Sequence, residues 1–270
     1  MLNKLSVAYN NRSISLESVS TLAILGDNGV GKTSLLERIA LVNKSNLDII
    51  LNYKGAVYYE KFKVTIDNQE VECSQIKAER LYNLVVSEYS YSCLGNLKYN
   101  VMIVYPSALT VHIHPSDHDI KFSEFVKPFI DGIIIHTAND FIYEKNNTIT
   151  FLDNLGKGVS SLVKLLHMIY INRPDILLID DIETLGLHPK RLTSFFEWIK
   201  QRIQEGYLKA MLFTTNSDSY TYLAEVDESS KFLLLSQEDY MIMNRQEVLD
   251  RLDYEDLRYT ALKLVKKDES

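Results

Sequence analysis

The stretch from Thr21 to Val42 reads TLAILGDNGVGKTSLLERIALV, and its three parts decide the fold. It begins with an apolar run that is typical of a buried strand, and a glycine-rich loop follows. Beyond the loop, Leu35, Leu36 and Ile39 recur at helical spacing. The stretch therefore predicts a strand that runs through a glycine-rich loop into a helix.

The loop from Gly26 to Thr33 fits the pattern GxxxxGK[ST], in which backbone N–H groups and a helix N-terminus surround phosphate. Glycine is needed there because side chains would keep the backbone away from the phosphate oxygens. We expect Lys32 to reach the β- and γ-phosphates and the Thr33 hydroxyl to bind Mg²⁺. The predicted phosphate-binding residues are Gly26, Asp27, Asn28, Gly29, Val30, Gly31, Lys32, Thr33 and Ser34.

Carboxylates follow a second apolar run, ILLIDDIE at 176–183, at the edge of the predicted sheet where ligands bind. We expect Asp180 to hold Mg²⁺ together with Thr33. Asp181 is a candidate general base for the attacking water, and Glu183 is its rival. In an extended strand, positions 181 and 183 share the face opposite Asp180, so the pattern leaves the base undecided between them.

The rest of the chain alternates helices and buried strands. From Val159 the chain is predicted to be helical again, and this helix stops before Pro174, whose ring clashes with the preceding turn. Pro189 begins another helix that ends near Gly206, and residues 210–215 form a further apolar strand. Unbroken aliphatic strands separated by helices indicate an α/β fold with a mostly parallel sheet covered on both faces. KFLLLS and YMIMN, near the C-terminus, predict an antiparallel edge hairpin.

Other segments predict a division into lobes. Residues 57–76 read as a β-hairpin around Asp67 and Asn68, so this part of the chain is expected to form antiparallel sheet. Residues 77–149 mix Tyr-rich and Val/Ile-rich stretches, and we expect an inserted lobe there. We therefore predict a single domain over 1–270, with a first lobe of about 1–76 and 150–270 and the inserted lobe at about 77–149.

Composition excludes several classes of protein. With 29 basic and 36 acidic residues the formal net charge is −7, unlike a protein that coats a nucleic-acid duplex by bulk positive charge. Cys73 and Cys93 are too few for a disulfide framework or a four-ligand zinc site, which favours a reducing compartment. Neither a signal peptide nor a long apolar run is apparent, so we expect a cytoplasmic protein without membrane association.

Four motifs follow one another along the chain: GDNGVGKT, LGKGVSSLVKLL, LLIDDIETLGLHP and LFTTNS. Together they resemble the motifs of ABC-type P-loop ATPase heads of the RecF/OLD/SMC-like group. Such proteins are often labelled AAA-family ATP-binding proteins in microbial genomes. The resemblance covers most of residues 20–45 and 150–220. It implies a mostly parallel core sheet flanked by helices, an antiparallel β lobe and a small inserted lobe. It also implies ATP and Mg²⁺ as cofactors.

The resemblance further implies a dimer. Gly156, Lys157 and Gly158 correspond to the signature segment, which in such heads docks on the γ-phosphate held by a second subunit. Glycines before a helix and a nearby lysine suit this role, because free N–H groups and the helix dipole attract an anion. We therefore expect an ATP-dependent homodimer in which each subunit completes the other's site.

Three departures from the family pattern point to slow hydrolysis. Gly156 replaces the usual signature serine, Asp181 replaces the longer catalytic glutamate, and Asn216 replaces the switch histidine, whose proton an amide cannot carry. The sequence thus predicts a slow ATPase that acts as a nucleotide-gated dimerisation switch, with DNA maintenance or defence as a role suggested by the resemblance. The alternative is a non-catalytic ATP-binding module that regulates a separate effector protein.

Two further patterns compete for a role. His112, His114, Asp117, His118 and Asp119 resemble the HxHxDH motif of metallo-β-lactamase hydrolases, but one extra residue before Asp117 breaks the match. A polar surface loop is the better interpretation. Tyr9 and Arg12 are candidates for stacking on adenine, with packing as the alternative. Nucleic acid stays a candidate partner that the net charge does not support.

Overall fold

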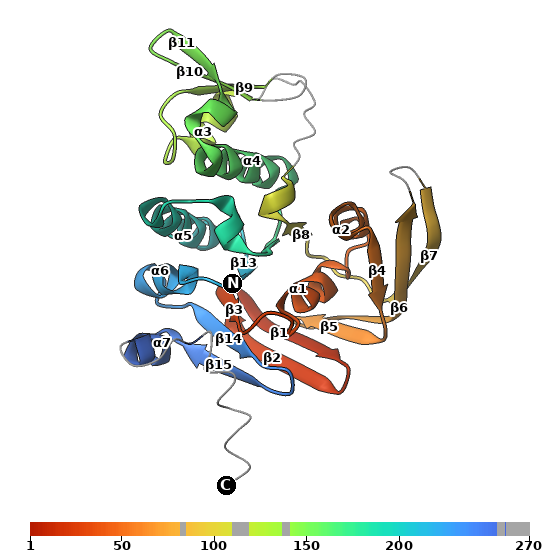
Figure 1. Cartoon of the computed structure of the whole chain (residues 1–270). Coiled ribbons are helices and arrows are strands. Elements are labelled where there is room, and N and C mark those ends of the chain that lie inside the picture. The colour runs from red at the N-terminus through yellow and green to blue at the C-terminus, as the bar shows by residue number, and fades with distance from the viewer. Residues whose placement is uncertain (82–84, 110–118, 137–140, 253–256, 258–270) are drawn as a thin grey trace.

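The structure is a computed structural model that describes residues 1–81, 85–109, 119–136, 141–252 and 257. Its centre is a six-stranded sheet in the order β15–β14–β3–β13–β12–β8 (Figure 1). The strands are β3 (Thr21–Leu25), β8 (Val101–Val104), β12 (Ile176–Ile179), β13 (Ala210–Thr214), β14 (Lys231–Leu235) and β15 (Tyr240–Asn244).

The central sheet is parallel except at one edge. β12 pairs in parallel with β8 and β13, and β3 pairs in parallel with β13 and β14. Only β15 runs antiparallel, as the outer strand of a hairpin with β14. Every residue of β3, β8, β12 and β13 is buried, because both faces of the sheet are covered. The predicted α/β class and edge hairpin are confirmed.

The central sheet separates two hydrophobic cores. Alternate residues of β3 face opposite sides: Leu22 and Ile24 belong to one core, Ala23 and Leu25 to the other. The first core includes α1 (Lys32–Ala40) and α2 (Asn46–Lys54), and the second includes the remaining helices. These are α3 (Asp119–Val126), α4 (Lys157–Asn172), α5 (Pro189–Gln204), α6 (Ser219–Val226) and α7 (Arg245–Leu252).

The helix ends follow the sequence signals. The α4 helix ends at Asn172, two residues before Pro174. Pro189 is the first residue of α5, and Gly206 after its end has a φ of 75°. None of the helices in the described part of the chain is long and apolar enough to cross a membrane.

An antiparallel sheet in the order β2–β1–β5–β6–β4 covers α1 and α2 (Figure 1). The predicted hairpin is confirmed: β5 pairs with β6, and Asp67 in the turn has a φ of 53°. A further strand, β7, pairs with β6. The strands are β1 (Leu2–Tyr9), β2 (Arg12–Val19), β4 (Ala56–Tyr59), β5 (Phe62–Ile66), β6 (Gln69–Leu81) and β7 (Val85–Leu94).

The two cysteines form a disulfide, which the sequence analysis did not expect. Cys73 of β6 and Cys93 of β7 lie directly opposite each other, with Cα atoms 4.0 Å apart. Two cysteines cannot staple a whole fold, but one pair brought into register by a hairpin can bond. The inference of a reducing compartment from unpaired thiols is therefore not supported.

A third sheet, β11–β10–β9, lies beyond α3 and α4 at one end of the molecule (Figure 1). Its strands are β9 (Ile133–His136), β10 (Phe141–Lys145) and β11 (Thr148–Phe151), and the 3-10 turn η2 (Leu152–Leu155) joins β11 to α4. The segment expected to be one inserted lobe, 77–149, is thus distributed over all three sheets. β7 extends the antiparallel sheet and β8 is an edge strand of the central one.

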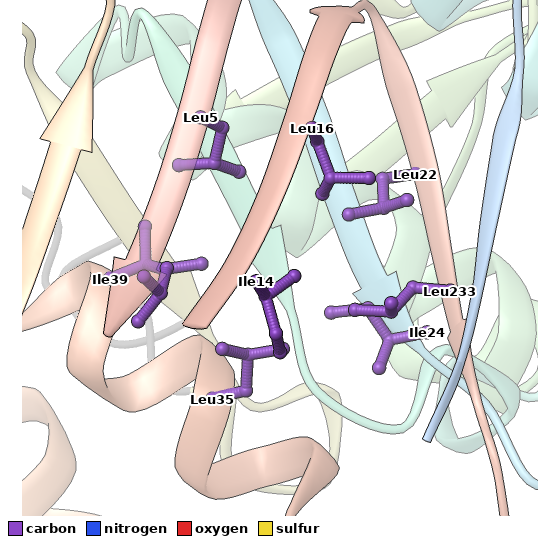
Figure 2. A pocket seen from close by; sticks show the side chains of 9 residues that line it. Leu5, Ile14, Leu16, Leu22, Ile24, Leu35, Ile39 and Leu233 are labelled. Atoms are coloured by element: carbon purple, nitrogen blue, oxygen red, sulfur yellow. The ribbon is translucent and has the colours of Figure 1, made fainter. Parts of the chain in front are cut away.

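In the first core, apolar side chains of β1, β2, β3, β14 and α1 meet around one cavity. Figure 2 shows Leu5, Ile14 and Leu35 converging with residues of the central sheet around a small cavity of about 10 Å³. Every residue that lines it is aliphatic, so the cavity offers a polar ligand no hydrogen bond. We therefore interpret the cavity as a packing defect of the core and not as a binding site.

A buried glutamate ties α1 to three neighbouring segments. Glu37 is fully buried, and its carboxylate accepts hydrogen bonds from Lys54 Nζ at 2.7 Å, from Tyr105 Oη at 2.7 Å and from the Tyr59 hydroxyl. Burial raises the pKa of Tyr59 and Tyr105, so both hydroxyls keep their protons and donate. The carboxylate is satisfied only when α1, α2, β4 and the end of β8 are assembled.

Replacing Glu37 by alanine should lower the free energy of unfolding by about 3–5 kcal/mol, because two buried hydroxyls and a partly buried ammonium lose their acceptor. Urea unfolding measures the change. Glu225→Ala, on the exposed side of α6, is the matched control and should change stability by less than about 0.5 kcal/mol. Equal unfolding midpoints for the two variants would contradict the role of Glu37.

Candidate active site

The loop between β3 and α1 has the geometry of a phosphate cradle. Gly26, Gly29 and Gly31 have φ angles of 135°, 84° and 100°, a region that other residues rarely adopt. A Cβ atom on Gly26 would lie 2.3 Å from the carbonyl oxygen of Leu235 in β14. Gly26 is therefore required by packing against the sheet, and Gly29 and Gly31 by backbone conformation.

Lys32, the first residue of α1, points back over this loop. Its Nζ donates to the carbonyl oxygens of Gly26 at 2.6 Å and Asp27 at 3.0 Å, and only 6% of the residue is exposed. Burial lowers the pKa of Lys32, and the nearby carboxylates of Asp181 and Glu183 partly offset this shift. The ammonium is thus held at the loop and surrounded by negative charge.

Asp180 follows β12 directly and is 3% exposed. The Thr33 hydroxyl of α1 donates to both of its carboxylate oxygens, at 2.9 and 3.2 Å, and the Thr214 hydroxyl of β13 donates to Oδ1 at 2.7 Å. Burial raises the pKa of Asp180, which these hydrogen bonds partly oppose. The structure thus places the two predicted metal ligands, Thr33 and Asp180, in direct contact.

Thr214 is a site residue that the sequence analysis missed. Besides donating to Asp180, its hydroxyl accepts a hydrogen bond from the backbone N–H of Asp181 at 2.8 Å. It thereby holds the carboxylate of Asp180 and the backbone of Asp181 from the neighbouring strand. The signal was present as a hydroxyl residue at the end of the otherwise apolar strand 210–214.

The expected strand alternation at positions 180–183 is wrong. β12 ends at Ile179, Asp181 has a left-handed φ of 52°, and residues 182–185 form a 3-10 turn. This turn brings Asp181 and Glu183 to the same residue: the side-chain Nδ2 of Asn216 donates to Asp181 Oδ1 at 3.1 Å, and its backbone N–H donates to Glu183 Oε1 at 2.8 Å. The three residues form one cluster.

The electrostatics of this cluster distinguish its two carboxylates. Burial and the negative charge of Glu183 raise the pKa of Asp181. The second oxygen of Glu183, Oε2, is buried and makes no hydrogen bond with any described residue. Four carboxylates, those of Asp27, Asp180, Asp181 and Glu183, act on the one ammonium of Lys32.

Such an excess of negative charge suits a divalent cation. The Thr33 hydroxyl and the Asp180 carboxylate are hard oxygen donors next to a phosphate cradle, and Mg²⁺ is bound in proteins by one or two such ligands together with phosphate oxygens. Glu183 Oε2 is buried without a hydrogen bond to any described residue, and it would be an acceptor for a hydrated ion bound next to it. The donor set therefore fits Mg²⁺.

The segment Gly156–Gly158 lies apart from this cluster. Gly156 precedes α4 with a φ of 97°, and a Cβ atom on Gly158 would lie 2.4 Å from the carbonyl oxygen of Gly186. Lys157 also lies over Gly186, which ends the turn after the carboxylates. The Gly156 N–H donates to the carbonyl oxygen of Asp153 in η2, while Lys157 and Gly158 contact the end of the 182–186 turn.

Two other candidates from the sequence have different outcomes. The Arg38 guanidinium lies over two tyrosine rings. Its Cζ atom is 4.3 Å from the centroid of the Tyr9 ring and 4.6 Å from the centroid of the Tyr59 ring. Tyr9 therefore packs within the first core region, as the alternative interpretation held. Residues 112–118, with the histidine-rich motif, lie outside the described residues.

The fold was compared with known proteins. No protein-family model matches the sequence, and none of the curated proteins matches it. Among solved structures, the SMC head domain from Thermotoga maritima superposes with a TM-score of 0.54 at 15% identity, over 90% of this chain and 98% of that one. CbiO1 of Clostridium perfringens, part of the ABC transporter complex cbiONQ, superposes with a TM-score of 0.52 at 14% identity, over 93% and 92% of the two chains.

The chain has the fold of an ABC-type P-loop ATPase head. A bacterial Atm1-family ABC exporter that was solved with ATP bound also matches this head, with a TM-score of 0.51 at 12% identity over 100% of this chain and 43% of that one. The motifs recognised in the sequence therefore occupy the head fold that they imply, although identities this low describe the fold alone.

The position of Thr214 in this head leads to a prediction. In Thr214→Val, Asp180 loses one hydrogen bond and the Asp181 N–H loses its acceptor, so Mg²⁺-dependent nucleotide binding should weaken at least about tenfold. Titration of a fluorescent ATP analogue, with and without Mg²⁺, measures the loss. Thr215→Val is the matched control, because the Thr215 hydroxyl bonds to Ser217 and to neither carboxylate. Equal affinities for both variants would contradict this role.

Proposed function

We propose that this ABC-type head is a Mg²⁺-dependent ATPase with slow turnover, whose ATP-bound form dimerises. The observation that carries the proposal is the cluster in which Asn216 holds both Asp181 and Glu183 beside the hydrogen-bonded Thr33–Asp180 pair. A structural glycine turn would need none of these carboxylates, and the burial of Asp180 costs free energy that its hydrogen bonds must offset.

In this proposal the loop and the first turn of α1 bind the phosphates. The N–H groups of the glycine loop and the Lys32 ammonium surround the phosphate oxygens, and Thr33 and Asp180 hold Mg²⁺, which neutralises charge on the phosphates during transfer. Phosphate would also offset the desolvation that lowers the pKa of Lys32, because an anion favours the charged ammonium.

The cluster geometry favours Asp181 as the general base. One of its oxygens accepts from Asn216, which leaves the other to accept a proton from water. Its raised pKa makes Asp181 a stronger base than an ordinary aspartate. Glu183 then acts through its charge on Asp181 and through the Asn216 backbone, as a positioning residue.

The same cluster accounts for slow turnover. An aspartate at 181 reaches less far than a glutamate, and Asn216 orients the carboxylate without being able to carry a proton. Binding of ATP depends on Lys32, Thr33 and Asp180, and at these three positions the residue types are those of the P-loop ATPase pattern. We therefore expect ATP binding to be strong relative to catalysis.

The role of Asp181 is tested by ATPase rates. Asp181→Ala should lower turnover at least about a hundredfold while nucleotide binding is preserved, because a general base contributes about 10²–10⁴-fold. Asp181→Glu should retain or raise turnover, and Lys32→Ala should abolish nucleotide binding. Equal rates in wild type and Asp181→Ala would favour the non-catalytic ATP-binding module, which regulates an effector through binding alone. A loss confined to Glu183→Ala would assign the base to Glu183 instead.

The proposed dimer follows from the position of Gly156–Gly158. Gly156 and Lys157 are exposed at the start of α4, next to the 182–186 turn, so the Lys157 ammonium and the helix N-terminus are accessible to the phosphate of a second subunit. Two heads related by a two-fold axis would each complete the other's site. A role in DNA maintenance or defence rests on the family resemblance alone.

Light scattering measures this switch directly. Wild type should double its mass in a non-hydrolysable ATP analogue with Mg²⁺ and be monomeric without it, and Lys32→Ala should be monomeric in both conditions. Lys157→Glu, which reverses an exposed charge in the signature segment, should bind the analogue but fail to dimerise. A Lys157→Glu protein that dimerises as well as wild type would contradict docking through this segment.

A further inference from the structure

The outer face of the sheet β11–β10–β9 is apolar and open to solvent. Alternate residues of a strand share a face, and the pairing register aligns six side chains in two rows across the three strands. Three of them, at positions 133, 149 and 151, expose 45%, 64% and 57% of their surface. The outer face consists of Ile133, Ile135, Ile142, Glu144, Ile149 and Phe151.

The opposite, inner face of this sheet already has its partners. Ile134 and Phe141 are fully buried, and Phe141 packs against Phe122 of α3 and His167 of α4 with ring centroids 6.1 and 5.1 Å away. Figure 1 shows α3 and α4 on the side of the sheet that faces the rest of the molecule. The outer face therefore contributes nothing to the core of its own lobe.

We propose that the outer face is a docking surface for an amphipathic helix of a partner protein, with a lysine or arginine placed opposite Glu144. An exposed cluster of large apolar side chains is typical of an interaction site, because isolated exposed residues are common and clusters are not. Docking through this face requires no nucleotide and is independent of the proposed ATPase activity.

The charge on the outer face specifies the partner. Glu144 lies on the middle strand between Ile149 and Ile133, and its carboxylate makes no hydrogen bond or ion pair with any described residue. The nearest lysine in sequence, Lys145, is engaged by Asp131 at 2.9 Å. A purely apolar partner would bury the Glu144 charge unpaired, which is unfavourable, whereas a cation would satisfy it.

The same charge disfavours a second copy of this chain as the occupant. Two outer faces packed against each other would bring the two Glu144 carboxylates into one interface, where like charges repel. The width of the face suits one helix: neighbouring strands lie about 4.8 Å apart, so three strands span about 10 Å, close to the diameter of an α-helix. Such a helix would present apolar residues at i, i+3, i+4 and i+7.

The face is also close to the proposed dimer contact. β11 continues directly into η2 and α4, and Asp153 of η2 accepts hydrogen bonds from Lys164 Nζ at 2.9 Å and from the Ser160 hydroxyl, both on α4. The outer face is therefore linked to Gly156 through the single turn η2. Any effect of docking on the nucleotide state rests on the proposed function, but docking itself does not.

Synthetic peptides test the proposal. The probe is a stapled helical peptide of about 15 residues, with leucines at i, i+3, i+4 and i+7 and one lysine within that stripe. A control peptide is identical except that glutamate replaces the lysine. Fluorescence anisotropy with the full chain, without nucleotide, should show at least about tenfold tighter binding of the lysine peptide. Glu144→Lys should reverse this preference.

Variants of the apolar side chains supply the second arm. Ile149→Ser and Phe151→Ser should each weaken binding of the lysine peptide at least about tenfold without lowering the melting temperature, because both residues are exposed. Ile242→Ser is the matched control on β15, where the isoleucine is 38% exposed, and should bind as wild type does.

Three results would overturn the proposal. The first is that the protein does not prefer the lysine peptide, or binds neither peptide, and the second is that Ile149→Ser and Phe151→Ser bind it as wild type does. The third is a nucleotide-free dimer that Phe151→Ser dissociates, because the occupant of the face would then be a second copy of the chain. ATP binding by the same preparations is measured in parallel. Protein that binds the peptide but no ATP contradicts the proposed function alone, and the reverse result contradicts the docking surface alone.

Discussion

The hydrogen bonds of the Asp180 carboxylate are the constraint on which the site depends. Asp180 is almost fully buried at the end of β12, where an ionised carboxylate is tolerated only if its oxygens are satisfied. Thr33 reaches it from α1 and Thr214 from β13. These two bonds fix the glycine loop, the carboxylates and the neighbouring strand relative to one another, so the parts of the site are held before any ligand arrives.

The left-handed turn at Asp181 produces the second half of the site. Because the chain leaves the strand after Ile179, Asp181 and Glu183 turn toward Asn216 instead of alternating across the sheet. Their negative charges add to those of Asp27 and Asp180, and the single positive charge of Lys32 does not neutralise all four carboxylates. A nucleotide with its divalent ion supplies phosphate for the lysine and positive charge for the carboxylates.

The molecule joins a tightly bonded core to a small peripheral lobe. Glu37 links α1 to α2, β4 and the end of β8, so the antiparallel sheet is fixed to the helix that begins at the phosphate loop. The β9–β11 lobe, in contrast, meets the core through α3, α4 and η2 and leaves one face of its sheet open. The open face is thus made of side chains that the core does not need for its own packing.

The sequence by itself determined the α/β class, the loop at 26–33, the helices that begin at Pro189 and end before Pro174, and the pairing of Thr33 with Asp180. These follow from local periodicity, from proline and glycine, and from the rule that parallel strands present their carboxyl ends at one edge. Only the tertiary structure decided the Asp181 turn, the role of Thr214, the Cys73–Cys93 bond and the division of residues 77–149 among three sheets. Each of these depends on the register between segments distant in sequence, and register is fixed by packing, which no local pattern encodes.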